Sequence, residues 1–205
     1  MLPKFEYRYN MYNMNTYHST SYHGNLSFNY GDSKSVEEAR ITFLEQHNRD
    51  IGSTVGMNLA HGANILAVDQ AQAGHTMLME VPVLPEADAV YTTNLDLTLF
   101  LLTADCVPIA FWDSHQTIKG LVHAGWRSLD LGILRKLVVQ LEQEQGADPE
   151  QLQFYFGPAI ATESYRHADP YTKFSSAWND YFVELSDEAY GVDLNQFAVD
   201  QLRSV

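Results

Sequence analysis

The chain has 205 residues, of which 45% are apolar and 19% charged, and this composition is typical of one well-packed globular domain. Its 26 acidic residues outnumber its 12 lysines and arginines, which gives a net charge of −14, and no stretch is rich in Lys or Arg. Because a nucleic-acid interface needs clustered cations, the composition argues against nucleic-acid binding.

The N-terminal segment and the cysteine usage bear on cellular setting. No apolar run approaches the roughly 20 residues of a membrane span, and residues 1–16 lack the apolar core of a secretory signal. A single cysteine, Cys106, excludes an internal disulfide framework. We therefore expect a cytoplasmic protein with no membrane association.

The N-terminal half predicts short strands around one helix. Apolar residues recur at helical spacing after Ser33 and Ser35, which predicts a helix through about Asn48 with one of these serines as its cap. The pattern over residues 69–86 is loose and is interrupted by prolines, as in long excursions that form lids. Strands are expected at 5–9, 53–59, 65–68 and 87–92.

The C-terminal half contains the most apolar segments. Near-continuous apolar runs at 97–102, 107–112 and 118–122 predict strands buried on both faces, and another strand is expected at 152–156. Helices are expected at 129–145, ended by Gly146, at 170–181, and at 193–203 with Asp193 as its cap. The alternation of strands and helices predicts an α/β fold in which the early strands can pair antiparallel.

Three residues at expected strand ends suggest a metal site. His61 follows one strand, Cys106 interrupts two apolar runs, and His123 ends the next run. One thiolate and two imidazoles suit zinc, whose catalytic sites use three protein ligands and leave a fourth position for water. His75, in the loose excursion, is a weaker candidate ligand. Spacing alone leaves open whether the three residues converge.

Two other interpretations of Cys106 follow from the same residues. His123 could favour the thiolate of Cys106 as a nucleophile, with Asp105 orienting a histidine, as in cysteine hydrolases. Alternatively, Cys106 is simply a small buried apolar residue, as most free cysteines are. By the same local reasoning, Arg40 is a surface cation paired with Glu37 or Glu45.

Several motifs carry a family resemblance. ADCVP followed by HAGWR, together with NLSFNYGD, VEEAR, NLAHG, EADAVYT and FGPAI, resembles the YfiH-like family over most of the chain between Gly24 and Tyr165. Members are variously called laccase-domain, polyphenol oxidase and purine nucleoside phosphorylase proteins. The resemblance implies a layered α-β-β-α sandwich with mixed sheets, similar to the catalytic domain of cytotoxic necrotising factor.

The resemblance also implies a zinc-dependent purine nucleoside enzyme. Its metal, zinc or alternatively copper, would be held by His61, Cys106 and His123. Its activities would be phosphorolysis of adenosine, inosine and methylthioadenosine, and deamination of adenosine. Its small-molecule partners would be a purine nucleoside and phosphate.

The substrate pocket implied by the resemblance involves further residues. Asn25 and Arg40 would line it, which reverses the surface interpretation of Arg40. Arg127 is a second cation for phosphate, although it could equally stack on the neighbouring Trp126.

The sequence departs from the family pattern in several places. Leu59 replaces a usual glutamine, Ser128 a usual glycine, and Arg166 a usual glutamate after Tyr165. Relatives also continue into a further segment with a Ser-Tyr-Arg-Arg motif, so we expect residues 1–205 to form a single domain that is C-terminally shortened relative to the family.

Three alternative functions remain open at this level. The first is a Cys–His hydrolase or amidase in cell-wall precursor editing. The second is a copper polyphenol oxidase, which the absence of a His-X-His pair disfavours for a multicopper centre. The third is an inactive nucleoside-binding protein. The sequence leaves the oligomeric state and the preferred nucleoside open.

Overall fold

A five-stranded mixed sheet lies at the centre of the structure, a computed structural model that describes residues 14–115, 117–186 and 188–205. Its strand order is β2 (Ile65–Ala67), β3 (Ala89–Thr92), β6 (Lys119–Ala124), β5 (Val107–Asp113) and β7 (Leu152–Phe156). The β2–β3 pair is parallel and the other pairs are antiparallel. These strands match the predicted ones, while the strand expected at 5–9 lies outside the described residues.

The central β5–β6 pair shows why the apolar runs form this sheet. Val107, Ile109 and Phe111 alternate along β5 and all are fully buried in one core cluster. Phe111 lies opposite Gly120 on β6, and a Cβ at Gly120 would lie 2.1 Å from the Phe111 ring. The glycine therefore makes room for the phenyl ring across the strands.

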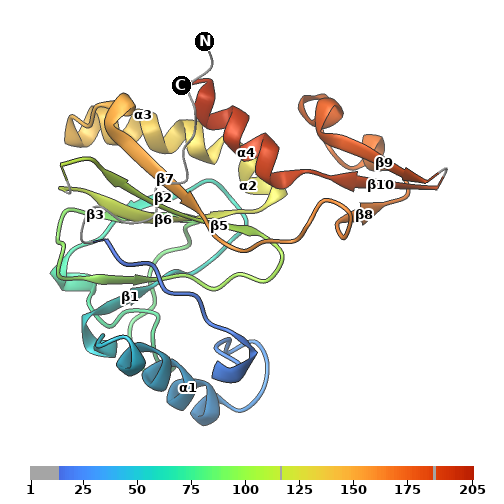
Figure 1. Cartoon of the computed structure of the whole chain (residues 1–205). Coiled ribbons are helices and arrows are strands. Elements are labelled where there is room, and N and C mark those ends of the chain that lie inside the picture. Colours follow the sequence, from blue (N-terminus) through green and yellow to red (C-terminus); the bar gives the residue numbers. More distant parts are fainter. Residues whose placement is uncertain (1–13, 116, 187) are drawn as a thin grey trace.

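Three helices cover one face of this sheet (Figure 1). They are α2 (Trp126–Asp130), α3 (Ile133–Gln145) and α4 (Leu194–Arg203). The prediction of one helix over 129–145 was wrong at its start, because Gly132 takes a φ of +76° and separates α2 from α3. Gly146 ends α3, and Asp193 caps α4 by accepting from the Gln196 N–H, as predicted.

The opposite face carries a small sheet and then a helix. Strands β1 (Thr54–Gly56) and β4 (Thr98–Phe100) pair parallel, and α1 (Ser33–Gln46) lies outside them (Figure 1). The cap of α1 is Asp32, which accepts from Ser35, and not one of the serines. The β1–β4 and β2–β3 pairs are parallel, so the antiparallel expectation was wrong for them, whereas β3 pairs antiparallel with β6 as expected.

Figure 1 thus shows α3 and α4, the central sheet, the β1–β4 pair and α1 as successive layers of a mixed α/β fold. This arrangement confirms the mixed α/β class. The similarity to the cytotoxic necrotising factor domain stays a prediction. No helix among the described residues is long and apolar enough to cross a membrane.

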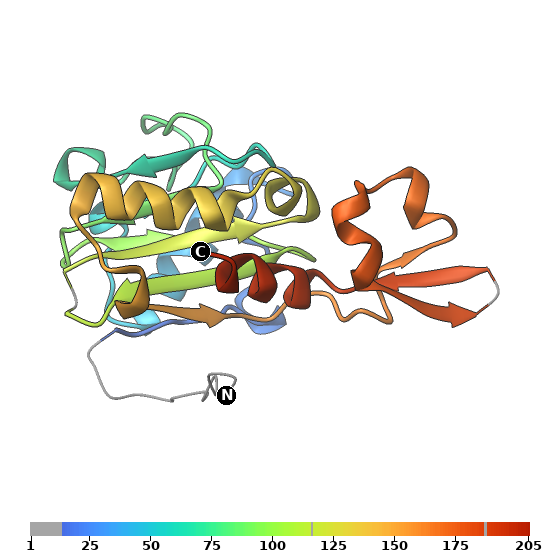
Figure 2. The ribbon, with the colours of Figure 1, turned by 90° about the horizontal axis from the view of Figure 1, so that it is seen from above.

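A C-terminal arm projects from the layered body (Figures 1 and 2). It holds an antiparallel sheet of β8 (Arg166–His167), β10 (Ala189–Val192) and β9 (Phe182–Ser186). The helix predicted at 170–181 is instead two short 3-10 segments, Pro170–Thr172 and Ser176–Tyr181. Its aromatic residues pack as a cluster and not as a helical stripe.

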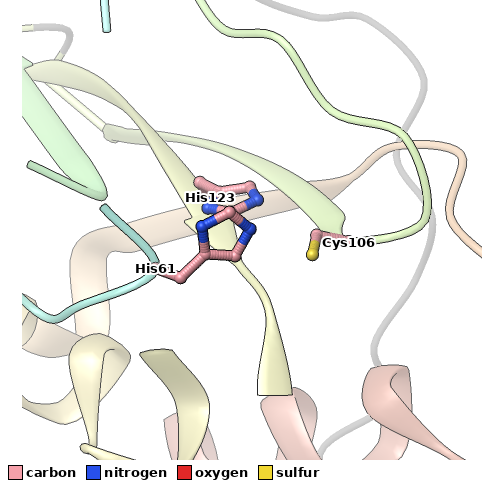
Figure 3. A group of neighbouring side chains, drawn as sticks. All are labelled: His61, Cys106 and His123. Carbon is pink, nitrogen blue, oxygen red and sulfur yellow. The ribbon is translucent and has the colours of Figure 1, made fainter. Parts of the chain in front are cut away.

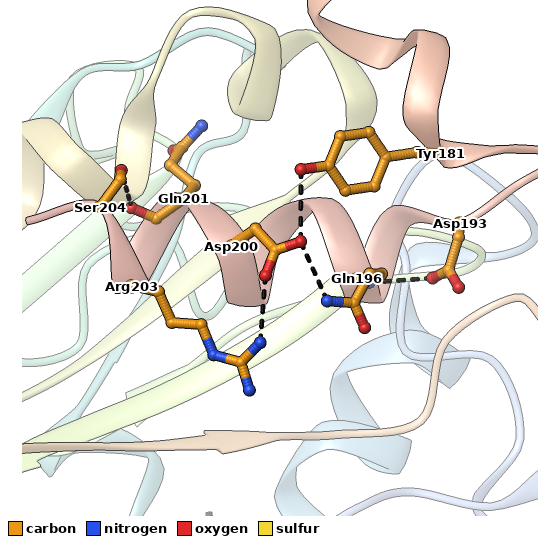
Figure 4. Close-up of polar contacts among 7 residues, drawn as sticks. All are labelled: Tyr181, Asp193, Gln196, Asp200, Gln201, Arg203 and Ser204. Carbon is orange, nitrogen blue, oxygen red and sulfur yellow. Dashed lines mark hydrogen bonds and ion pairs between the residues drawn. The ribbon is translucent and has the colours of Figure 1, made fainter. Parts of the chain in front are cut away.

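The arm is fixed to α4 by aromatic and polar contacts. Trp178 is fully buried and stacks on Phe197, with ring centroids 3.8 Å apart. Tyr181 donates a hydrogen bond to Asp200, which also accepts from Gln196 (Figure 4). These contacts hold the base of the arm against the body.

Candidate metal centre

The candidate residues meet at one edge of the central sheet because of the strand directions. Strands β2, β3 and β5 begin at this edge, and β6 and β7 end there. His61 lies in the loop before β2, Cys106 directly precedes β5, and His123 lies near the end of β6. Asp88, which directly precedes β3, joins them. The topology thus brings together residues that are far apart in the sequence.

The donor atoms of His61, Cys106 and His123 all lie within 4.8 Å of one another (Figure 3). The two imidazoles are nearly perpendicular, with centroids 4.9 Å apart and an interplanar angle of 87°. Ligands of a tetrahedral zinc ion lie about 3.3–3.6 Å apart for metal bonds of about 2.0–2.3 Å. His61 is exposed and Cys106 half-buried, so small side-chain movements would close this set around an ion. The donor set therefore fits zinc.

Asp88 is the residue that orients both histidines. Its buried carboxylate accepts from Nδ1 of His123 at 2.8 Å and from the backbone N–H groups of His61 at 2.9 Å and Gly62 at 2.6 Å. Because Nδ1 donates to Asp88, Nε2 of His123 is the nitrogen that would ligate, after it has lost its proton. A carboxylate that orients a metal-binding histidine is a common second contact in zinc sites.

Burial, hydrogen bonds and neighbouring charges shift the pKa values of Asp88, His123 and His61. Burial raises the pKa of Asp88, but hydrogen bonds from His123, Gly62 and His61 outweigh burial and hold that pKa below its ordinary value. Burial lowers the pKa of His123, but its hydrogen bonds to Asp88 and Cys106 outweigh burial and raise that pKa to about 9. Burial and the charge of His123 lower the pKa of His61. His61 is therefore in the neutral form that ligates metals.

The backbone around Cys106 is closely packed. A Cβ at Gly125 would lie 2.9 Å from Sγ of Cys106, so the glycine of HAGWR leaves room for the thiol. Ile160, from FGPAI, donates its N–H to the carbonyl of Asp105 at 3.0 Å. The role of Asp105 that the structure shows is thus a backbone contact, and its side chain is exposed.

Tyr165 and Arg127 lie beside the three donors. Burial and the charge of Cys106 raise the pKa of Tyr165 to about 12, against the opposing charge of Arg127. Arg127 stacks over Trp126 with its guanidinium carbon 4.5 Å from the ring centroid. Sequence reasoning identified Arg127 but not Asp88 or Tyr165. The signal for Asp88 was an acidic residue directly before a buried strand.

Arg40 and Asn25 lie outside this group of donors. Arg40 is only 4% exposed, so its interpretation as a surface cation was wrong. Its Nε donates to the carbonyl of Leu26 at 2.8 Å, and its Nη1 donates to the carbonyls of Thr76 and Met77 at 3.0 and 2.9 Å.

Asn25 and His75 are likewise separate from the three donors. The side-chain amide of Asn25 donates to the carbonyls of Ser27 and Tyr30, which closes a local turn. His75 is not part of the metal-ligating group. Pocket roles for Asn25 and Arg40 remain predictions.

Comparison with known proteins agrees with the motifs. Residues 11–205 match the sequence family described as multi-copper polyphenol oxidoreductase laccase. The chain belongs to this family. The match reaches beyond the Gly24–Tyr165 range of the resemblance and includes the arm and α4.

Curated relatives of this laccase family are named as nucleoside enzymes. The chain is 30% identical over 130 residues to the purine nucleoside phosphorylase YlmD of Bacillus subtilis (strain 168), covering 63% of this chain and 47% of YlmD. It is 30% identical over 138 residues to the adenosine deaminase RL5 of an unknown prokaryotic organism, covering 67% and 52% of the two chains. The chain therefore spans about half the length of these curated relatives.

Solved structures share the fold. YlmD from Geobacillus stearothermophilus superposes with a TM-score of 0.80 at 27% identity, covering 88% of this chain and 69% of that one. The YfiH protein of Bacillus licheniformis superposes with a TM-score of 0.76 at 24% identity, covering 84% and 67%.

Proposed function

We propose that this chain is a zinc-dependent purine nucleoside enzyme, which phosphorolyses adenosine, inosine and methylthioadenosine and deaminates adenosine. The names of the relatives support the substrate class. A reducing cytoplasm is part of the proposal, because the thiol of Cys106 must stay reduced to ligate.

The observation that carries the proposal is the donor set of His61, Cys106 and His123 within 4.8 Å, oriented by Asp88. A zinc ion in such a site acts as a Lewis acid and activates water. His61, Cys106 and His123 would hold the ion, and Asp88 would keep Nε2 of His123 turned toward it.

The remaining residues would bind the substrates and hold protons. Tyr165 keeps its phenolic proton at neutral pH, so it can donate a hydrogen bond to a substrate oxygen or nitrogen. Asn25 and Arg40 are proposed to line the nucleoside pocket, and Arg127 is proposed to bind phosphate.

Zinc content and inosine phosphorolysis test this proposal together. The purified chain is expected to hold one zinc ion and to form ribose 1-phosphate from inosine and phosphate. Cys106→Ala should lose both, while His75→Ala, which removes a histidine outside the donor group, should lose neither. Substoichiometric zinc, or phosphorolysis unchanged by Cys106→Ala, would contradict the proposal. Tight nucleoside binding without turnover would identify an inactive binding protein instead.

A second candidate function is a metal-free cysteine hydrolase or amidase acting on a peptide-like bond, as in cell-wall precursor editing. The thiol of Cys106 lies within 4.8 Å of a ring nitrogen of His123, and Asp88 is hydrogen-bonded to that imidazole, which favours this function. A covalent adduct trapped at Cys106, with activity that survives a chelator, would support this function. Loss of all activity on chelation would exclude it.

The copper oxidase function in the family's description has less support. Among the described residues, the one potential metal-ligating group of His, Cys, Asp and Glu is His61, Cys106 and His123. Such a set can hold a lone copper, whereas a multicopper centre needs more histidines. Absence of phenol oxidation by the fully copper-loaded chain would exclude this function.

A further inference from the structure

Two cations each lie against the ring of Trp126, next to the candidate metal centre. Arg127, the second residue of α2, places its guanidinium carbon 4.5 Å from the centroid of the Trp126 ring. Lys173, from the C-terminal arm, places Nζ 5.6 Å from the same centroid. The same ammonium lies 6.0 Å from the Tyr165 ring and 5.4 Å from the Phe174 ring. The body and the arm thus each contribute one positive charge.

The position of Lys173 is fixed by its neighbour. Phe174 is buried and packs on Trp126, with ring centroids 5.0 Å apart, so the backbone of Lys173 is anchored while its side chain stays exposed. His167 packs edge-on against Phe174 at 5.1 Å, and its buried Nε2 has no hydrogen-bond partner. The two cations therefore lie on a packed group of aromatic rings, the platform formed by Trp126, Tyr165 and Phe174.

Neither Arg127 nor Lys173 forms an ion pair with a carboxylate in the part of the chain that the structure describes. The nearby carboxylate of Asp130 instead accepts from Nε1 of Trp178 at 2.9 Å and from the hydroxyl of Ser175. In a chain with 26 acidic residues, two unpaired cations in one place are unexpected. Burial and the charge of Arg127 lower the pKa of Lys173, and an anion bound by both side chains would relieve the repulsion between the two positive charges.

This platform adjoins the donors of the metal centre. A Cβ built on Gly125 would lie 2.9 Å from Sγ of Cys106 and 3.8 Å from the ring of His123, and Trp126 and Arg127 directly follow Gly125 in the chain. Arg40, the other arginine considered for phosphate, already donates through Nε and Nη1 to backbone carbonyls.

We propose that Arg127 and Lys173 together bind a phosphate oxyanion beside the His61–Cys106–His123 group. The planar guanidinium offers paired N–H donors to two oxygens, and the ammonium adds a point charge, a combination suited to a phosphate dianion. The proposal rests on the proposed function, because phosphorolysis consumes inorganic phosphate. It assigns to the arm a direct role in substrate binding.

Calorimetric titration of the zinc-loaded chain with inorganic phosphate tests this subsite without requiring turnover. Lys173→Gln and Arg127→Gln should each weaken phosphate binding by at least about tenfold, with zinc content unchanged. Lys173→Arg should restore most of the affinity. Lys136→Gln, which removes an exposed lysine from α3, is the matched control and should bind as the parent chain does. Phosphate affinity unchanged in Lys173→Gln, or equally reduced in Lys136→Gln, overturns the subsite.

Two further comparisons separate the possible outcomes. If AMP binds no more tightly than adenosine, the subsite binds free phosphate. If AMP binds more tightly than adenosine and Lys173→Gln abolishes the difference, the subsite binds the phosphoryl group of a nucleotide. Phosphate binding that depends on both cations, without any phosphorolysis, keeps the subsite and removes the proposed activity. If both variants catalyse phosphorolysis with the same KM for phosphate as the parent chain, the proposed activity stands and the subsite is wrong.

Discussion

The carboxylate of Asp88 accepts a hydrogen bond from Nδ1 of His123 at 2.8 Å, and both side chains are buried. The same carboxylate accepts the backbone N–H of His61, which has a left-handed φ of +56°. One side chain thus fixes the ring of one candidate ligand and the backbone of another. This coupling makes Asp88 the residue on which the shape of the candidate metal centre depends most directly.

Asp88→Asn should weaken zinc binding by about 10–100-fold, because an amide cannot accept from His123 and the two backbone groups as a carboxylate does. Competition with a chromogenic chelator measures the dissociation constant. Asp96→Asn, which changes an exposed aspartate, is the control and should bind zinc as the parent does. Equal zinc affinities in all three chains would show that Asp88 does not position the ligands.

Gly125→Ala should displace the thiol of Cys106, because the added Cβ would lie 2.9 Å from Sγ. We expect the free energy of unfolding to fall by about 1–3 kcal/mol, as for overpacked sites, and zinc affinity to fall by about tenfold or more. Gly62→Ala is the matched control, since its Cβ would meet Asp88 at an ordinary 3.7 Å. Urea unfolding and chelator competition measure the two effects. A Gly125→Ala chain that keeps full zinc affinity would contradict the close packing at the thiol.

Elements with a strong apolar pattern were predicted correctly. The near-continuous apolar run at 107–112 predicts β5, and the stripe of Ile133, Leu134, Leu137 and Leu141 predicts α3. The arm was mispredicted because its strands are short and its aromatic residues follow no helical or strand period. Phe174 and Trp178 are buried by residues from other segments, a relationship that local pattern does not contain.

The candidate site was predictable in its donors but not in its supporting contacts. His61, Cys106 and His123 have side chains typical of zinc ligands and lie at predicted strand ends, so the sequence made them candidates, while the family resemblance implied that they form one set. Asp88 contacts a histidine 35 positions away, and Lys173 reaches Trp126 from the arm. These contacts depend on the sheet order and on the packing of the arm. No local sequence pattern indicates either of them.

Arg40→Met should destabilise the chain, because it leaves the carbonyls of Leu26, Thr76 and Met77 without their donors. Each unpaired buried polar group costs about 1–3 kcal/mol, so we expect a loss of about 3 kcal/mol or more in the free energy of unfolding. Arg40→Lys should recover part of it. Urea unfolding measures the loss, with Arg135→Met as an exposed arginine control. Unchanged stability in Arg40→Met would show that these three hydrogen bonds do not stabilise the fold.

Asp113 should make the free energy of unfolding depend on pH in the acidic range. Burial raises its pKa, but hydrogen bonds from the backbone N–H of Ile118 and from the hydroxyl and N–H of Thr117 outweigh burial and hold that pKa below 3.8. A carboxylate whose pKa is lower in the folded chain stabilises it above pH 3.8, and this contribution is lost as the pH falls through the folded value. Asp113→Asn should therefore be less stable than the parent at pH 6, and the difference should narrow toward pH 3. Urea unfolding at both pH values measures it, with Asp96→Asn as control. A difference that stays constant with pH would show that the charge of Asp113 does not stabilise the β5–β6 turn.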